Sequence, residues 1–131
     1  VLMKTKPKSS LRLIILIVIL GVCLLLVVLA VQNHTLRRWI DNVLYDNQGH
    51  YLTCEQLPEL VEVEAVLAEH QDMVLAIEAV HPDNAGVELD TSCPGKGSLT
   101  IWYANRADRE QIEAILDSDT FFGIPYNLNN R

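Results

Sequence analysis

The sequence has few of the patterns that mark catalytic or metal-binding proteins. Its three cysteines show no C-x2-C spacing and its four histidines no H-x3-H spacing, which are the spacings of common zinc sites. No serine stands in a G-x-S-x-G sequence. Residues 93–98 resemble a phosphate-binding loop, but they lack its first glycine, and glycine follows their lysine. We therefore predict no catalytic residue, no cofactor and no bound metal, and we expect that the protein is not an enzyme.

Basic residues are scarce beyond residue 32. From residue 33 onward, 17 acidic residues stand against six basic ones, a balance of −11. A domain this acidic repels phosphate backbones, so nucleic acid is excluded as a partner. Residues 1–12 have the opposite character, because they carry Lys4, Lys6, Lys8 and Arg12 and no acid.

Polar side chains are absent between Arg12 and Gln32. Residues 13–31 form an apolar run of 19 residues, and a helix of that length spans about 28 Å, close to the hydrocarbon thickness of a bilayer. A core helix with one face in water would show polar residues with a period of 3.6, and this run shows none. We predict a transmembrane helix at residues 13–32, with the lipid bilayer as its surroundings.

A cleaved secretory signal is the alternative interpretation of this run. The basic start fits, and residues 28–30 end in a small residue, so cleavage near Ala30 would release a secreted domain. The apolar core is longer than the 7–15 residues usual for a signal peptide, which favours the membrane anchor.

The flanks of the apolar run predict its orientation. Four basic residues precede it, whereas only Arg37 and Arg38 follow it closely, and this excess favours a cytoplasmic N-terminus. Residues 33–44 would then be a juxtamembrane segment in which Trp39 suits the membrane interface. We expect a single-pass protein of a bacterial inner membrane, with residues 45–131 as an extracytoplasmic domain.

The periodicity of residues 45–131 predicts a small α+β domain. The predicted elements are a strand or hairpin within 43–53, a helix from 56 or 57 to 70, strands at 73–77 and 98–103, a helix at 106–117 capped by Asn105, and a strand at 121–126. Pro125 would confine this last strand to a sheet edge. The order strand, helix, strand, strand, helix, strand is that of the ferredoxin-like fold, and another two-layer α+β sandwich is the alternative.

Two cysteines lie outside the apolar run. In a ferredoxin-like fold, Cys54 and Cys93 follow two strands of the same direction, so both emerge at one end of the sheet. A disulfide there would close a loop of about 40 residues and stabilise the domain by about 4 kcal/mol on the chain-entropy model. A metal site built from these cysteines with His50 and His81 is the alternative, and it lacks the usual spacing.

A long connection and several aromatic residues are the candidates for contacts with other molecules. His81 and Asp83 open the connection to the strand at 98–103, and long ordered connections are often functional. Trp102 and Tyr103 are neighbours in that strand, so one faces the helices and the other faces outward. Trp39 completes the set of interface candidates.

These features together favour a protein-interaction role. We expect a membrane-anchored extracytoplasmic module that binds another membrane or envelope protein as an accessory or structural subunit. The alternative is a sensor domain that binds a small ligand or cation between the loops at the disulfide end, for which a concave, partly apolar pocket would be required. The sequence indicates neither the partner nor the oligomeric state.

Overall fold

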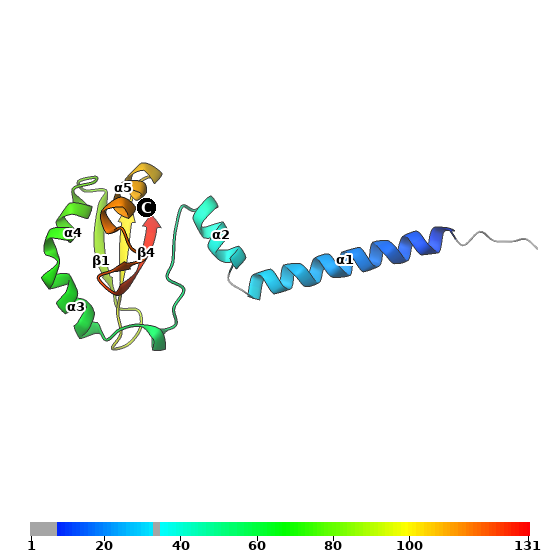
Figure 1. Cartoon of the computed structure of the whole chain (residues 1–131), viewed down its shortest axis with the longest axis horizontal. Coiled ribbons are helices and arrows are strands. Elements are labelled where there is room, and N and C mark those ends of the chain that lie inside the picture. Colours follow the sequence, from blue (N-terminus) through cyan, green and yellow to red (C-terminus); the bar gives the residue numbers. More distant parts are fainter. Residues whose placement is uncertain (1–7, 33–34) are drawn as a thin grey trace, which may run out of the picture. The chain divides into compact units, whose positions relative to one another are not determined.

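The computed structural model describes residues 8–32 and 35–131, and Figure 1 shows their secondary structure. The chain divides into two compact units, residues 1–39 and 40–131, and each is described by itself. Lys4 and Lys6, on which the predicted orientation partly depends, lie outside the described residues.

The first unit consists mainly of the helix α1 (Lys8–Gln32). Its side chains from residue 11 to residue 29 are exposed, and no polar stripe interrupts them. Within the described part of the chain, α1 is one helix long and apolar enough to cross a membrane, and a signal sequence would meet the same test.

The helix α2 (Thr35–Leu44) extends across the boundary between the two units. Leu36, Trp39, Ile40 and Val43 have helical spacing, and this pattern explains why the segment is helical. At its C-terminal end, the backbone carbonyl of Asp41 accepts a hydrogen bond from the amide of Asn47 at 2.8 Å. This hydrogen bond ties the segment that follows α2 to the last turns of the helix.

The remainder of the second unit is a mixed α+β domain. Its strands form one four-stranded sheet in the order β1-β2-β4-β3. β1 and β2 are antiparallel, β2 and β4 are parallel, and β3 and β4 are antiparallel. The elements are the short 3-10 helix η1 (Cys54–Gln56), α3 (Leu60–Glu69), α4 (Gln71–Glu78), β1 (Ala85–Asp90), β2 (Ser98–Tyr103), α5 (Arg106–Leu116), β3 (Thr120–Phe121) and β4 (Ile124–Asn130).

The helices cover one face of the sheet. Leu99, Ile101 and Tyr103 alternate along β2 and are completely buried, whereas the residues between them face the other side. The buried helical residues that pack with them belong to the same core: Val63 on α3, Val74 and Ile77 on α4, and Ile112 on α5.

The prediction of a strand at residues 73–77 is wrong, because this segment lies in α4. Val74 and Ile77 are buried and Leu75 is exposed, which is the burial pattern of a helix rather than of a strand buried on both faces. A short apolar run does not distinguish the two by composition alone. The strand that does precede β2 is β1, which lies within the long connection predicted between residues 81 and 98.

The strand or hairpin expected within residues 43–53 is also not formed. Residues 43 and 44 end α2, and only Gln48 makes an isolated antiparallel bridge, to Leu128 of β4. The predicted helix at 56–70 begins later, at Leu60, because Thr53 and Gln56 instead close the separate turn η1, in which the Thr53 amide donates to the Gln56 side chain at 3.0 Å.

The strand at 98–103 and the helix capped by Asn105 are confirmed as β2 and α5. The side chain of Asn105 accepts a hydrogen bond from the amide of Asp108 at 3.1 Å, as an N-cap does. The strand predicted at 121–126 is wrong in its bounds, because residues 122 and 123 form a turn between β3 and β4. The last strand, β4, is not at an edge, because it lies between β2 and β3. Pro125 is tolerated there because the register with β2 begins one residue later, at Tyr126. The ferredoxin-like order is therefore not confirmed, and the order seen is α3-α4-β1-β2-α5-β3-β4.

Candidate functional site

A shallow depression of about 580 Å³ lies where α4 meets β1. Leu75 is its most prominent apolar residue, because the side chain stays 61% exposed although it stands on a helix that packs against the sheet. We call this the Trp102 depression, and its lining residues are Leu75, Glu78, Ala79, Pro82, Asp83, Ala85 and Trp102.

Trp102 is held across the edge of the sheet by its neighbours. Gly86 lies opposite it on β1, and a Cβ atom at Gly86 would stand 2.7 Å from the indole ring, so glycine lets the ring lie over the β1 backbone. The Arg131 guanidinium lies 5.6 Å from the ring centroid. Arg131 also donates two hydrogen bonds of 2.9 Å to the Glu88 carboxylate and thereby lowers the pKa of Glu88. The half-buried indole is thus a fixed wall of the depression.

The strand β1 forms one edge of the sheet. The direction of its free backbone groups follows from β2, where the carbonyl of Tyr103 accepts from the amide of Arg131 and so points toward β4. Neighbouring residues of a strand point their backbone groups to opposite sides. The backbone amide and carbonyl of Trp102 therefore point toward β1 and form hydrogen bonds with the backbone of its partner Gly86. The β1 residues that alternate with those bonded to β2 therefore point their backbone amides and carbonyls away from the sheet. These residues are Ala85, Val87 and Leu89.

The surface around the depression is acidic. Residues 45–131 contain 16 acidic residues and four basic ones. All four basic side chains, those of Lys96, Arg106, Arg109 and Arg131, already form ion pairs with carboxylates of the same domain. Glu78 and Asp83 line the depression itself. A binding partner with positive charge would be favoured there over a negative one.

The structure brings two of the predicted interface residues together. Asp83 and Trp102 both line the Trp102 depression, and His81 lies in the same turn, where its carbonyl accepts from the Asn84 amide at 2.9 Å. Tyr103 is completely buried, so it is not available to a partner. Trp39 is exposed on α2 but belongs to the first unit.

The His81 side chain has a structural partner. Its Nδ1 atom lies 2.8 Å from Oδ2 of Asp108, and Asp108 also accepts a hydrogen bond of 2.8 Å from the Asn105 side chain. The first contact joins the turn before β1 to the first turn of α5, and the second lies within the N-terminal end of α5 and holds the Asp108 carboxylate in place. The contact between His81 and Asp108 therefore has a structural role, because it connects the turn before β1 to α5.

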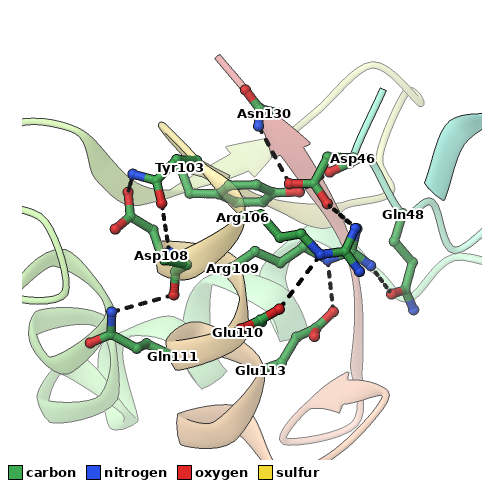
Figure 2. Close-up of polar contacts among 12 residues, drawn as sticks. Asp46, Gln48, Tyr103, Arg106, Asp108, Arg109, Glu110, Gln111, Glu113 and Asn130 are labelled. Atoms are coloured by element: carbon green, nitrogen blue, oxygen red, sulfur yellow. Dashed lines mark hydrogen bonds and ion pairs between the residues drawn. The ribbon is translucent and has the colours of Figure 1, made fainter. Parts of the chain in front are cut away.

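A second polar cluster fixes the segment after α2 to the domain, and sequence reasoning missed it. Figure 2 shows Arg109 of α5 between carboxylates that come from distant parts of the chain. Arg109 donates to Asp46 at 2.9 Å, to Glu113 at 2.9 Å and to Gln48 at 3.1 Å. The Tyr103 hydroxyl donates to the carbonyl of Asp46, and burial raises the pKa of Tyr103 to about 12. Because Asp46 and Arg109 are 63 residues apart, no local sequence signal relates them.

The structure contains the predicted disulfide between Cys54 and Cys93, whose Cα atoms are 5.4 Å apart. His50 lies in the segment before Cys54, and its Nε2 atom lies 3.2 Å from the Ser98 hydroxyl. Within residues 8–32 and 35–131, no group of three or more histidine, cysteine or acidic side chains is placed to hold a metal ion. The four residues of the alternative metal site thus have other partners.

Among the described residues, two more depressions border α5 and the β3–β4 hairpin. One of about 520 Å³ is bordered by Glu113, Asp117 and Asp119, and another of about 280 Å³ lies beside the β3–β4 hairpin near Met73 and Phe122. Neither of them, nor the Trp102 depression, is lined by the sequence neighbours of Cys54 or Cys93, where the sensor hypothesis places its ligand.

The Trp102 depression offers apolar surface, fixed aromatic area, acidic side chains and outward backbone groups. Such a set of groups binds by shape, charge and hydrogen bonds. Comparisons with protein-family models, with curated proteins and with solved structures find no match to this chain.

Proposed function

We propose that this protein is a membrane-anchored protein-interaction module, in which residues 45–131 bind another membrane or envelope protein on the extracytoplasmic side of a bacterial inner membrane. It would act there as an accessory or structural subunit and would catalyse no reaction. The observation that carries the proposal is the Trp102 depression, where exposed apolar and aromatic surface adjoins an unpaired sheet edge.

The membrane part of the proposal is supported by α1 and by the charge of its flanks. The helix is long and apolar enough to span a bilayer. Four basic residues precede its apolar run and two follow it closely, which favours a cytoplasmic N-terminus. The Cys54–Cys93 disulfide supports the same orientation independently, because disulfides persist in oxidising compartments such as the bacterial periplasm.

The interaction part of the proposal is supported by the exposure of Leu75. An exposed leucine alone would be ordinary. Here it adjoins Ala79, Pro82 and a tryptophan whose position is fixed by Gly86 and Arg131. Rigid aromatic side chains beside small apolar recesses are typical of the energetic centres of protein interfaces.

The test is capture of a partner by the tagged full-length chain from native membranes solubilised in a mild detergent. Leu75→Glu places a charge in the depression, and we expect it to reduce partner recovery by about tenfold or more. Val61→Glu is the matched control, because Val61 is 75% exposed on α3 and does not line the depression. Recovery with V61E should equal that of the unmodified chain. Equal recovery with both variants, or neither a stable partner nor self-association of the unmodified chain, would contradict the proposal.

A further inference from the structure

We propose that the outer edge of β1 binds an extended, positively charged segment of the partner protein, which adds to the sheet as a fifth strand. This inference rests on the proposed interaction function and specifies how the partner would bind.

The backbone of β1 is prepared for such an addition. Ala85, Val87 and Leu89 point their amide and carbonyl groups away from β2, and no described residue forms a hydrogen bond with these outward groups. An extended peptide beside β1 would satisfy them in the register that strands use in sheets. Main-chain hydrogen bonds of this kind provide the affinity in β-strand addition.

The side chains on both sides of the edge provide recesses for the added strand. Successive side chains of a strand point to opposite faces of the sheet. One set of the guest's side chains would meet Leu75 and Ala79 of α4, and the other set would meet the ring of Trp102, which lies over Gly86. The Trp102 depression is therefore where the side-chain specificity of the added strand would arise.

The charge of the domain decides which occupant fits. Glu78 and Asp83 line the depression, whereas the exposed Glu88 of β1 is already paired with Arg131. A second copy of this chain paired edge to edge would bring two strongly acidic domains together, with 16 acidic and four basic residues in each. Binding of a segment with lysine or arginine beside apolar residues is favoured by the negative potential of the same domain.

The experiment uses the full-length chain in neutral detergent micelles and a synthetic eight-residue peptide of alternating valine and lysine, measured by fluorescence anisotropy. Two further peptides carry N-methyl groups on all valines or on all lysines. In an added strand only one of these two sets of amides faces β1. We expect one N-methylated peptide to bind about tenfold or more weakly than the parent peptide and the other to bind nearly as well. A valine–glutamate peptide should not bind.

Val87→Pro tests the host side. Proline removes the outward amide of Val87 but leaves the hydrogen bonds of Gly86 and Glu88 to β2 intact, and proline is tolerated at a sheet edge. Val87→Thr is the matched control, because it keeps the amide and nearly the same shape. We expect V87P to weaken binding of the parent peptide about tenfold and V87T to change it little.

Three results with purified components would overturn the inference, and a fourth comes from capture of the partner from membranes. One is no binding of the parent peptide, and another is equal binding of both N-methylated peptides, which would indicate attraction by charge alone. The third is self-association of the unmodified chain that V87P abolishes, which would make a second copy the occupant. If V87P leaves partner capture from membranes intact while L75E abolishes it, strand addition fails and the interaction function stands.

Discussion

Arg109 is the residue on which the most distant contacts of the domain converge. Its side chain is only 7% exposed, and its hydrogen bonds join α5 to the segment after α2. Burial lowers the pKa of Arg109, but hydrogen bonds and charge from Glu113 outweigh this effect and raise it overall. The guanidinium therefore stays charged and keeps residues 46–48 against the domain.

Replacing Arg109 with alanine should destabilise the domain by about 2–4 kcal/mol, because the carboxylate of Asp46 would remain partly buried without its main partner. Arg106→Ala is the control. Arg106 also reaches Asp46, at 3.7 Å, but its side chain is 66% exposed, so the loss should stay below about 1 kcal/mol. Denaturant unfolding of the full-length chain in detergent measures both values, and similar losses for the two variants would contradict this account.

We expect His50 to lower the free energy of unfolding of the domain as the pH becomes mildly acidic. Burial lowers the pKa of His50, although the nearby Asp90 carboxylate acts in the opposite direction. Its Nδ1 atom accepts a hydrogen bond from the Leu52 amide at 3.0 Å, which requires that nitrogen to be unprotonated. Below the ordinary histidine pKa of about 6.5, the unfolded chain binds a proton that the folded chain resists, so stability falls as the pH falls.

We expect the midpoint of urea unfolding to decrease between pH 7 and pH 5, and His50→Asn to flatten this dependence. Asparagine keeps a side-chain acceptor for the Leu52 amide but does not titrate. The Asp90 carboxylate, whose pKa is lowered by hydrogen bonds from Ser92, loses its contribution only at more acidic pH. The same slope in the variant and the unmodified chain would show that His50 is not the group responsible.

Individual residues differed in how well the sequence predicted them. The disulfide was predictable because only two cysteines lie outside the apolar run. The alternation that buries Tyr103 and leaves Trp102 at the surface follows from strand geometry once β2 is identified, although which of the two is buried does not. The contact of Asp46 with Arg109 could not be predicted, because it depends on how distant elements pack.

Among the elements, those with a strong signal of their own were predicted and the others were not. The alternating residues of β2 and the capped start of α5 gave such signals. β1 did not, because Gly86, Glu88 and Asp90 stand on its outer face and resemble a loop in sequence. Its strand conformation comes from pairing with β2, and the residues that hid it from prediction are those that form the acidic face beside the candidate site.

The β3–β4 hairpin contains an unusual backbone conformation. Phe122 and Gly123 form its turn with φ angles of 50° and 90°, a region that suits glycine and asparagine but not a bulky side chain. The Phe122 ring stacks on His70, with ring centroids 3.5 Å apart. This stacking offsets part of the cost of the strained turn.

Two substitutions at Phe122 separate the turn from the stacking. Phe122→Ala and Phe122→Asn both remove the ring, but asparagine tolerates the left-handed region better. We therefore expect the asparagine variant to be more stable than the alanine variant by about 1 kcal/mol, measured by guanidinium unfolding. Equal stabilities would show that the backbone conformation at this position carries no cost.

At the scale of the whole molecule, the proposed orientation in the membrane places the two bonded cysteines in an oxidising compartment. Cys23 lies in α1 and is not bonded, whereas Cys54 and Cys93 are bonded to each other. Counting reactive thiols in the intact chain therefore distinguishes the topologies. We expect a maleimide reagent, added after denaturation of protein from native membranes, to label one cysteine without reductant and three after reduction.

The other topologies predict different counts. Cleavage near Ala30 would remove Cys23 and give no labelled cysteine without reductant and two after reduction. A domain retained in the reducing cytoplasm would give three in both conditions. Replacing Lys4, Lys6 and Lys8 with alanine leaves one basic residue before the apolar run against Arg37 and Arg38 after it, and reverses the charge difference that favours a cytoplasmic N-terminus. We expect a fraction of that variant to show three reactive thiols without reductant, because a domain left in the cytoplasm would not form its disulfide. An unchanged count of one would mean that the charge of the flanks does not set the orientation.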